Sequence, residues 1–168
     1  MAFKKPIVAV GGELRELQPG DTLLATVSNA ESFNFVNGEA ATTMVIGNVT
    51  YISSSGTVKL ARANNLDNSK TVGLVGATTI GVGASGAIFR SGILTATQTE
   101  WDTVNAEFPG GDPDGLTPNA TYFLSDAVAG KITPNPPTNA GSVVVPIGVA
   151  ISSTEMMLDM FQFRVVRS

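Results

Sequence analysis

The sequence has 168 residues and a net charge of −4, and only 14% of its residues are charged, against about 25% in an average soluble domain. It contains no cysteine and no histidine, which excludes disulfides, thiolate metal sites and any Ser-His-Asp triad. The acidic balance argues against a nucleic-acid-binding protein, which needs a basic surface. No apolar run reaches the length of a membrane span, and no stretch has the order of a signal peptide, so we expect no membrane partner. Because of the acidic charge, we expect no nucleic-acid partner either.

The N-terminal region, residues 1–36, reads as short strands and turns with little core of its own. Ile7–Val10, residues 13–17, 22–27 and 32–36 are strand candidates, separated by glycine- and proline-containing turns. Such a segment can add to the exposed sheet edge of a neighbouring molecule. We therefore expect an anchoring arm that docks on a partner or on a sister protomer, with the interaction candidates Ile7, Val8, Leu14, Leu17 and Leu23.

The body, residues 37–168, shows short β-branched runs between glycine, proline, asparagine and serine. This pattern is typical of an all-β sandwich or barrel. The clearest strand candidates are residues 49–52, 57–60, 71–75, 87–89 and 93–95. The apolar tail, residues 156–166, is a further strand candidate whose Phe161 and Phe163 join the interaction candidates.

One segment reads as a helix. Thr97 and Glu100 have the spacing of a capping box, which satisfies two free N–H groups at the start of a helix. Trp101, Val104 and Phe108 then recur on one helical face. We expect a helix near residues 98–107, anchored on the sheet by Trp101, with Pro109 and the glycines after it ending the element.

The chain also repeats itself. Residues 48–52 (NVTYI) resemble 119–123 (NATYF), and each is followed by a glycine and a short strand, at 56–59 and 130–133. Each then reaches a β-run that contains one glycine, at 72–75 and 147–150. The pattern predicts a duplicated β-meander with related halves at about 44–95 and 115–160, in which both tyrosines occupy the same position.

No motif indicates catalysis or a cofactor. Residues 81–86 match the dinucleotide fingerprint G-x-G-x-x-G, but a β-run follows where that motif needs a helix. Asp112 and Asp114 flank a proline in a turn, which reads as a solvated turn with a weak cation site as the alternative. Trp101 reads as a core residue, with a carbohydrate or partner contact as its alternative.

Several segments resemble those of tailed-bacteriophage virion proteins. The N-terminal region resembles the N-terminal segments of such proteins, and the body resembles small β-rich head-decoration (capsid cement) and fibre-type proteins. The residues that carry the resemblance are 5–8 and 12–23, then 37–40, 48–52, 92–97, 101–102, 115–125, 130–133 and 147–152.

The resemblance implies a non-enzymatic structural protein without catalytic residues, cofactor or metal. Its implied partners are the major capsid protein and further copies of itself, as a homo-oligomer and by analogy a trimer. The implied location is the outer capsid surface of the virion, after synthesis in the host cytoplasm. Two alternatives remain open: a tail or head fibre that contacts the host surface, and a carbohydrate-binding or carbohydrate-active module.

Overall fold

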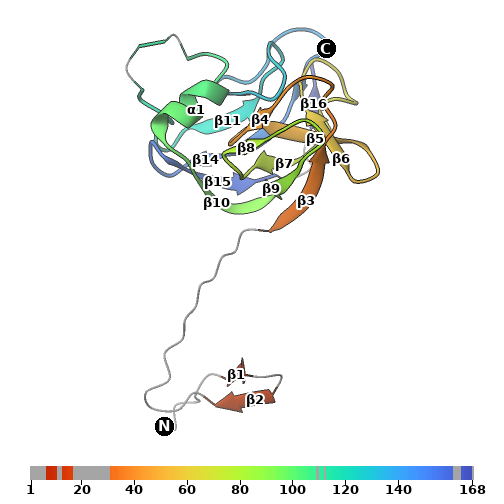
Figure 1. Ribbon diagram of the computed structural model, residues 1–168. Helices are drawn as coiled ribbons and strands as arrows, with labels where there is room; N and C mark the ends of the chain where they lie inside the picture. The colour runs from red at the N-terminus through yellow and green to blue at the C-terminus, as the bar shows by residue number, and fades with distance from the viewer. Residues whose placement is uncertain are drawn as a thin grey trace.

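Strands dominate the regular structure, and one short helix interrupts them (Figure 1). The computed structural model describes residues 7–10, 13–16, 31–108, 110–111, 113–160 and 164–167. The helix α1 spans Gln98–Val104. The strands are β1 (Ile7–Val10), β2 (Glu13–Glu16), β3 (Ser32–Asn37), β4 (Met44–Val45), β5 (Val49–Ser54), β6 (Thr57–Leu60), β7 (Thr71–Val75), β8 (Thr79–Ile80), β9 (Ser85–Phe89), β10 (Ser91–Thr95), β11 (Thr121–Leu124), β12 (Ile132–Thr133), β13 (Val143–Val144), β14 (Pro146–Ala150), β15 (Glu155–Asp159) and β16 (Val165–Val166).

Five strands close into a barrel in the order β3-β6-β5-β7-β9, which confirms the predicted β-barrel. Neighbouring strands pair antiparallel, except that β3 and β6 close the barrel in parallel, with Val36 opposite Thr57 and Asn37 opposite Val58. Residues 32–36, which the sequence analysis assigns to the arm, thus form an integral barrel strand. The body therefore begins no later than Ser32, because the barrel cannot close without β3.

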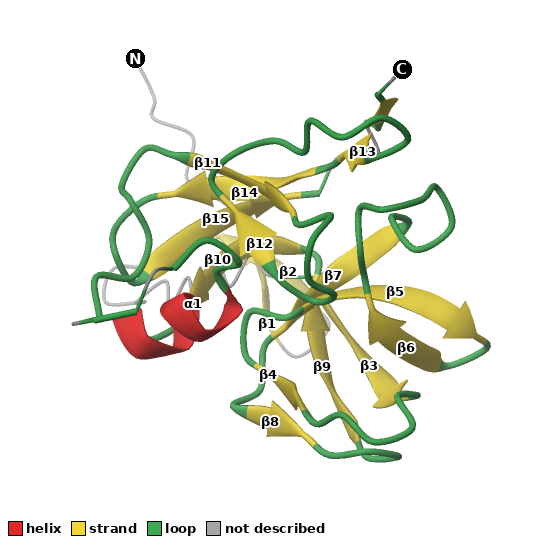
Figure 2. Cartoon of the chain, turned by 90° about the horizontal axis from the view of Figure 1, so that it is seen from above, coloured by secondary structure: helices red, strands yellow, loops and turns green. Residues whose placement is uncertain are grey.

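A second sheet of five strands has the order β10-β15-β14-β11-β12. Seen from above, these strands and α1 lie on one side of the body and the barrel strands lie on the other (Figure 2). Two small pairs complete the fold: β4 with β8, and β13 with β16.

The two sheets share one topology. Numbered along the chain within each sheet, the strands lie side by side in the order first, fifth, fourth, second, third. These are β3, β9, β7, β5 and β6 in the barrel, and β10, β15, β14, β11 and β12 in the second sheet. This is the arrangement that the predicted duplication requires. The repeating units are larger than predicted, at 32–89 and 91–159, because each includes a first strand that the sequence comparison left out.

A short motif recurs at the end of β3, in Val36–Glu39 (VNGE), and at the end of α1, in Val104–Glu107 (VNAE). In both copies the asparagine Oδ1 accepts a hydrogen bond from the backbone N–H of the glutamate, over 2.9 Å at Asn37 and 3.1 Å at Asn105. Our sequence analysis missed this repeat because α1 stands between β10 and its second copy.

The same motif makes equivalent strand contacts in both units. Asn37 pairs in parallel with Val58, and Asn105 forms a parallel bridge with Ile132. In the barrel this contact extends over two residue pairs and completes the closure. In the second sheet the contact is a single bridge. Asn105 there follows the helix α1 instead of ending a strand, so no strand extends the contact.

The two units differ in register by one residue. Thr50 faces Gly73 in the barrel, whereas Tyr122 faces Gly148 in the second sheet, and a bulge follows both. The prediction that the two tyrosines occupy the same position is therefore wrong: Tyr51 is half-buried and Tyr122 is fully buried. A slip of one residue sends each side chain to the opposite face of a strand.

Glycine is required at the corresponding place in both units. A Cβ on Gly73 would lie 2.6 Å from the carbonyl oxygen of Phe89, and one on Gly148 would lie 2.4 Å from that of Met157. Both approaches are too short for a real side chain, so the backbones of the neighbouring strands come close only because these positions carry no side chain.

The helix α1 begins as predicted and ends earlier than predicted. Thr97 and Glu100 form the capping box, and Trp101 and Val104 are fully buried. The helix ends at Val104 instead of near residue 107, because Asn105 is extended and bridges to β12. Phe108, expected on the helical face, lies beyond the helix.

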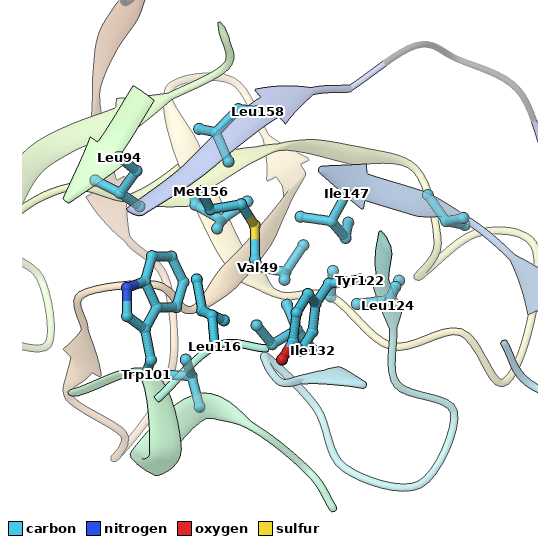
Figure 3. Close-up of a cluster of buried hydrophobic side chains, with 14 of the residues drawn as sticks. Val49, Leu94, Trp101, Leu116, Tyr122, Leu124, Ile132, Ile147, Met156 and Leu158 are labelled. Atoms are coloured by element: carbon cyan, nitrogen blue, oxygen red, sulfur yellow. The ribbon is translucent and has the colours of Figure 1, made fainter. Parts of the chain in front are cut away.

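Two apolar clusters form the core. One fills the barrel with Met44, Val58, Val75, Ile80 and Ile88. The larger one lies between the outer side of the barrel and the second sheet, and its side chains point toward one another (Figure 3). Its largest members are Leu74, Leu94, Trp101, Leu116, Tyr122, Leu124, Ile132, Ile147, Met156 and Leu158.

Of the predicted arm, the structure describes residues 31–36 and the backbone of two strands. Among the described residues, β1 and β2 pair with each other and with no other strand, with Ile7 opposite Glu16 and Val10 opposite Glu13. Within the described part of the chain, no helix is both long and apolar enough to cross a membrane.

Candidate partner-binding surfaces

A shallow cup with both apolar and polar walls lies beside strands β3, β5 and β7 of the barrel. Its cavity of about 320 Å³ is lined by Phe33, Phe35, Ile52, Thr71, Val72, Arg90 and Met160. Phe33 is 50% exposed and Ile52 is 49% exposed, so large apolar groups face solvent here. Pockets with apolar walls and a few polar groups are common binding sites.

The interior of the barrel is closed below the cup. Ile80 fills the space beside Gly86, where a Cβ would lie 2.3 Å from the Ile80 Cδ1 atom. Phe35 stands opposite Gly86 in the ladder and packs on the barrel cluster. The cup is therefore shallow and can admit one or two side chains or a small molecule.

Arg90 is the only charged residue among those that line the cup. The ion pair found in the described part of the chain joins Lys70 and Asp67, far along the sequence from Arg90. No ion pair of Arg90 is found among the described residues, and its guanidinium can donate hydrogen bonds to a carboxylate.

A second apolar surface lies on the outer face of the second sheet. Ile93 pairs with Met157, and Met157 with Val149, so the three side chains form one row across β10, β15 and β14. Ile93 is 53% exposed and Met157 is 47% exposed. This row is the candidate for a partner contact on the second sheet.

The predicted interaction residues fall largely outside the described part of the chain. The backbone of Ile7, Val8 and Leu14 is described, in β1 and β2, but their side chains are not. Leu17, Leu23, Phe161 and Phe163 lie outside the described residues. The cup and the outer row were missed in the sequence, because cross-strand pairing brings their residues together from distant segments.

Trp101 belongs to the core and is not a contact residue. Its indole is fully buried, and its Nε1–H donates a hydrogen bond to the carbonyl oxygen of Thr154 over 3.0 Å. Tyr122 is also buried, and its hydroxyl accepts a hydrogen bond from the Thr117 N–H over 2.9 Å. These two rings therefore cannot form a stacking platform for a sugar.

The other motifs have structural explanations. β9 begins at Ser85, inside the glycine-rich match at residues 81–86, so a strand follows the motif where a dinucleotide site needs a helix. Of the predicted acidic turn, Asp112 lies outside the described residues and Asp114 is exposed. The described residues contain no group of three or more acidic side chains placed to hold a metal ion.

One buried carboxylate was missed in the sequence. Asp102 on α1 is 4% exposed; its Oδ1 accepts the Gly115 N–H over 3.0 Å, while its Oδ2 is buried without a hydrogen-bond partner among the described residues. Burial raises the pKa of Asp102, and the negative charge of Asp114 raises it further, against the lowering effect of the Gly115 hydrogen bond. The hydrogen bond from Gly115 to Asp102 thus fixes the loop that follows α1, while the buried negative charge lowers the stability of the folded protein.

Replacing Asp102 with asparagine should raise the free energy of unfolding at pH 7. The pKa of Asp102 is near 4 in the unfolded chain and is raised in the folded protein. At low pH the protonated carboxyl therefore does not reduce the free energy of unfolding, whereas above the folded-state pKa the buried charge reduces it. Asparagine keeps the acceptor for Gly115 without the charge. Urea unfolding at pH 7 and pH 3 should show the gain only at pH 7, and an equal gain at both would contradict this account.

No family model matches the chain, and no curated protein is significantly similar to it.

Proposed function

We propose that this protein is a non-enzymatic structural protein of a tailed-phage virion, a decoration (capsid cement) protein that binds the major capsid lattice and stabilises it. The observation that carries the proposal is the cup beside the barrel strands, in which the large apolar side chains of Phe33 and Ile52 are about half exposed. Surfaces of this kind mark sites that a partner protein covers. The phage assignment itself rests on the sequence resemblance.

The rest of the body fits a protein that works by adhesion. The chain has few charged residues, and a second exposed apolar row lies on the sheet away from the core. A stable interface buries about 800 Å² per partner. A closed homo-oligomer, in our proposal a trimer on the outer capsid surface, repeats the capsid contact and thereby multiplies its effect.

Copy number tests this function. Virions that carry the protein should contain it in an amount comparable to the major capsid protein, measured by quantitative gel densitometry of purified particles. Decoration of a lattice needs many copies, whereas a fibre or tail appendage needs few. A small number of copies per particle would contradict decoration and favour the appendage, and glycan turnover by the purified protein would contradict both.

A further inference from the structure

The segment around α1 is strongly acidic. Residues 91–130 carry six carboxylates and no lysine or arginine, whereas the whole chain has a net charge of only −4. The fold brings two of these carboxylates together, Asp102 on α1 and Asp114 in the loop after it, because the Gly115 N–H donates to the Asp102 Oδ1 atom over 3.0 Å. Two negative charges therefore meet at the outer margin of the body, where Figure 2 shows α1.

The Asp102 carboxylate is buried and incompletely paired. The residue is 4% exposed, and its Oδ2 atom has no hydrogen-bond partner among the described residues. Within the same part of the chain, no lysine or arginine forms an ion pair with it. Burial raises the pKa of Asp102, and the Asp114 carboxylate beside it raises that pKa further through its charge and its side-chain contact. A buried carboxylate is costly unless it is paired, so the pair of aspartates lacks a positive charge.

The loop end that carries Asp114 is held in place by the surrounding elements. The Gln98 Nε2 atom donates to the carbonyl oxygen of Asp114 over 3.3 Å, and the Leu116 N–H donates to the carbonyl oxygen of Ser153 over 3.0 Å. Gly115 has a φ of 70°, and a Cβ there would lie 2.2 Å from the Ser153 carbonyl oxygen. Asp114 is therefore fixed beside Asp102 before any ligand arrives.

We propose that Asp102 and Asp114 together bind a calcium ion. Calcium prefers oxygen ligands and takes about six to eight of them from carboxylates, main-chain carbonyls and water. The two carboxylates balance its charge, and the ion gives the buried Oδ2 atom the positive partner that it lacks. Because Asp114 is exposed, its side chain can turn and admit an ion from solvent. Magnesium is less suited, because it demands near-ideal octahedral geometry and gives up its water reluctantly.

A bound ion would reverse the effect of the buried charge on stability. Without calcium, the Asp102 carboxylate lowers the free energy of unfolding, and the gain predicted above for Asp102→Asn belongs to this calcium-free protein. With calcium, the same carboxylate ties α1 to the loop after it. Weak calcium sites have dissociation constants of about 10⁻⁴–10⁻³ M, which is the affinity expected here. The inference does not depend on capsid binding, because it concerns the isolated protein.

Thermal unfolding followed by circular dichroism tests the site on the full-length protein. The midpoint of unfolding should rise by at least about 3 °C between EDTA and about 10 mM calcium chloride, since a ligand that binds only the folded state stabilises it. Sodium chloride of equal ionic strength is the control for general screening of the acidic segment, and it should give a much smaller rise.

Two substitutions test the assigned ligands. Asp114→Asn and Asp102→Asn should each abolish the calcium-dependent rise, and Asp102→Asn should unfold at a higher temperature than the native chain in EDTA. Glu100→Gln is the matched control, because it also removes one negative charge from α1 while glutamine preserves the capping box with Thr97. It should leave the calcium-dependent rise unchanged.

Terbium luminescence provides a second measurement, because Trp101 is the only tryptophan of the chain and adjoins Asp102 in the sequence. Terbium, which replaces calcium in oxygen sites, should show saturable luminescence excited through the indole, and calcium should displace it. The proposal is overturned if calcium has no effect beyond that of sodium chloride, if both aspartate variants keep the rise, or if Glu100→Gln loses it equally. A native chain that responds to pH alone would assign a shared proton to the two aspartates instead of a metal ion. None of these outcomes bears on the copy number in virions, so this inference and the proposed function can fail separately.

Discussion

Replacing Trp101 with alanine should destabilise the protein by about 3–5 kcal/mol, which is typical for loss of a fully buried aromatic side chain. The indole belongs to the larger apolar cluster, where it lies beside α1, and it is 0% exposed (Figure 3). It packs so closely that a Cβ on Gly47 would lie 3.2 Å from the ring. Its removal would leave a cavity between α1 and the two sheets. Urea unfolding followed by circular dichroism measures the loss.

Trp101→Phe is the control for this prediction. Phenylalanine keeps much of the ring volume but loses the Nε1–H donor to the Thr154 carbonyl, so the cost should fall to about 1–3 kcal/mol. A loss below about 1 kcal/mol in Trp101→Ala would contradict a core role. It would reopen the interpretation of Trp101 as a carbohydrate or partner contact.

Replacing Asn37 with alanine should cost on the order of 3 kcal/mol, because each buried polar group left unpaired costs roughly 1–3 kcal/mol. The Asn37 Nδ2 atom donates to the carbonyl oxygens of Thr42 and Ile80, both over 2.9 Å, and its Oδ1 accepts the Glu39 N–H. The side chain is 1% exposed, so water cannot replace these partners. It ties the strand that closes the barrel to the segments that lead into β4 and out of β8.

Asn105→Ala is the internal control, since Asn105 occupies the equivalent position in the second unit. Its side chain makes one described hydrogen bond, to the Glu107 N–H, and it is only partly buried. The expected cost is about 0.5–1.5 kcal/mol. Thermal unfolding of both variants tests the difference, and equal losses would show that the motif serves the two units alike.

The duplication explains why the two halves offer different surfaces. The barrel closes through β3 and β6, whereas the second sheet does not close among the described residues, and α1 follows its first strand. One topology thus yields a closed barrel with a cup and a second sheet that stays open. In our proposal the cup serves the capsid contact.

Local sequence signals were reliable where the structure depends on neighbouring residues. The capping box at Thr97 places the start of α1, and residues 57–60 and 71–75 are strands with the predicted bounds. The strand patterns around Gly56 and Gly130 indicated a repeat, and both glycines adopt positive φ angles, of 73° and 74°. These features follow from backbone preferences and hydrogen bonds within a few residues.

Tertiary structure alone decided the register, the closure and the exposed surfaces. Several features depend on partners that are distant in the sequence. They are the bulges beside Thr50 and Tyr122, the end of α1 at Val104 and the place of β3 in the barrel. Sequence alternation shows that a strand has two faces, but not which strand lies beside it, and a slip of one residue exchanges those faces. The cup and the exposed row of Ile93 and Met157 exist only after the strands have paired, because both bring together side chains from segments that are distant in the sequence.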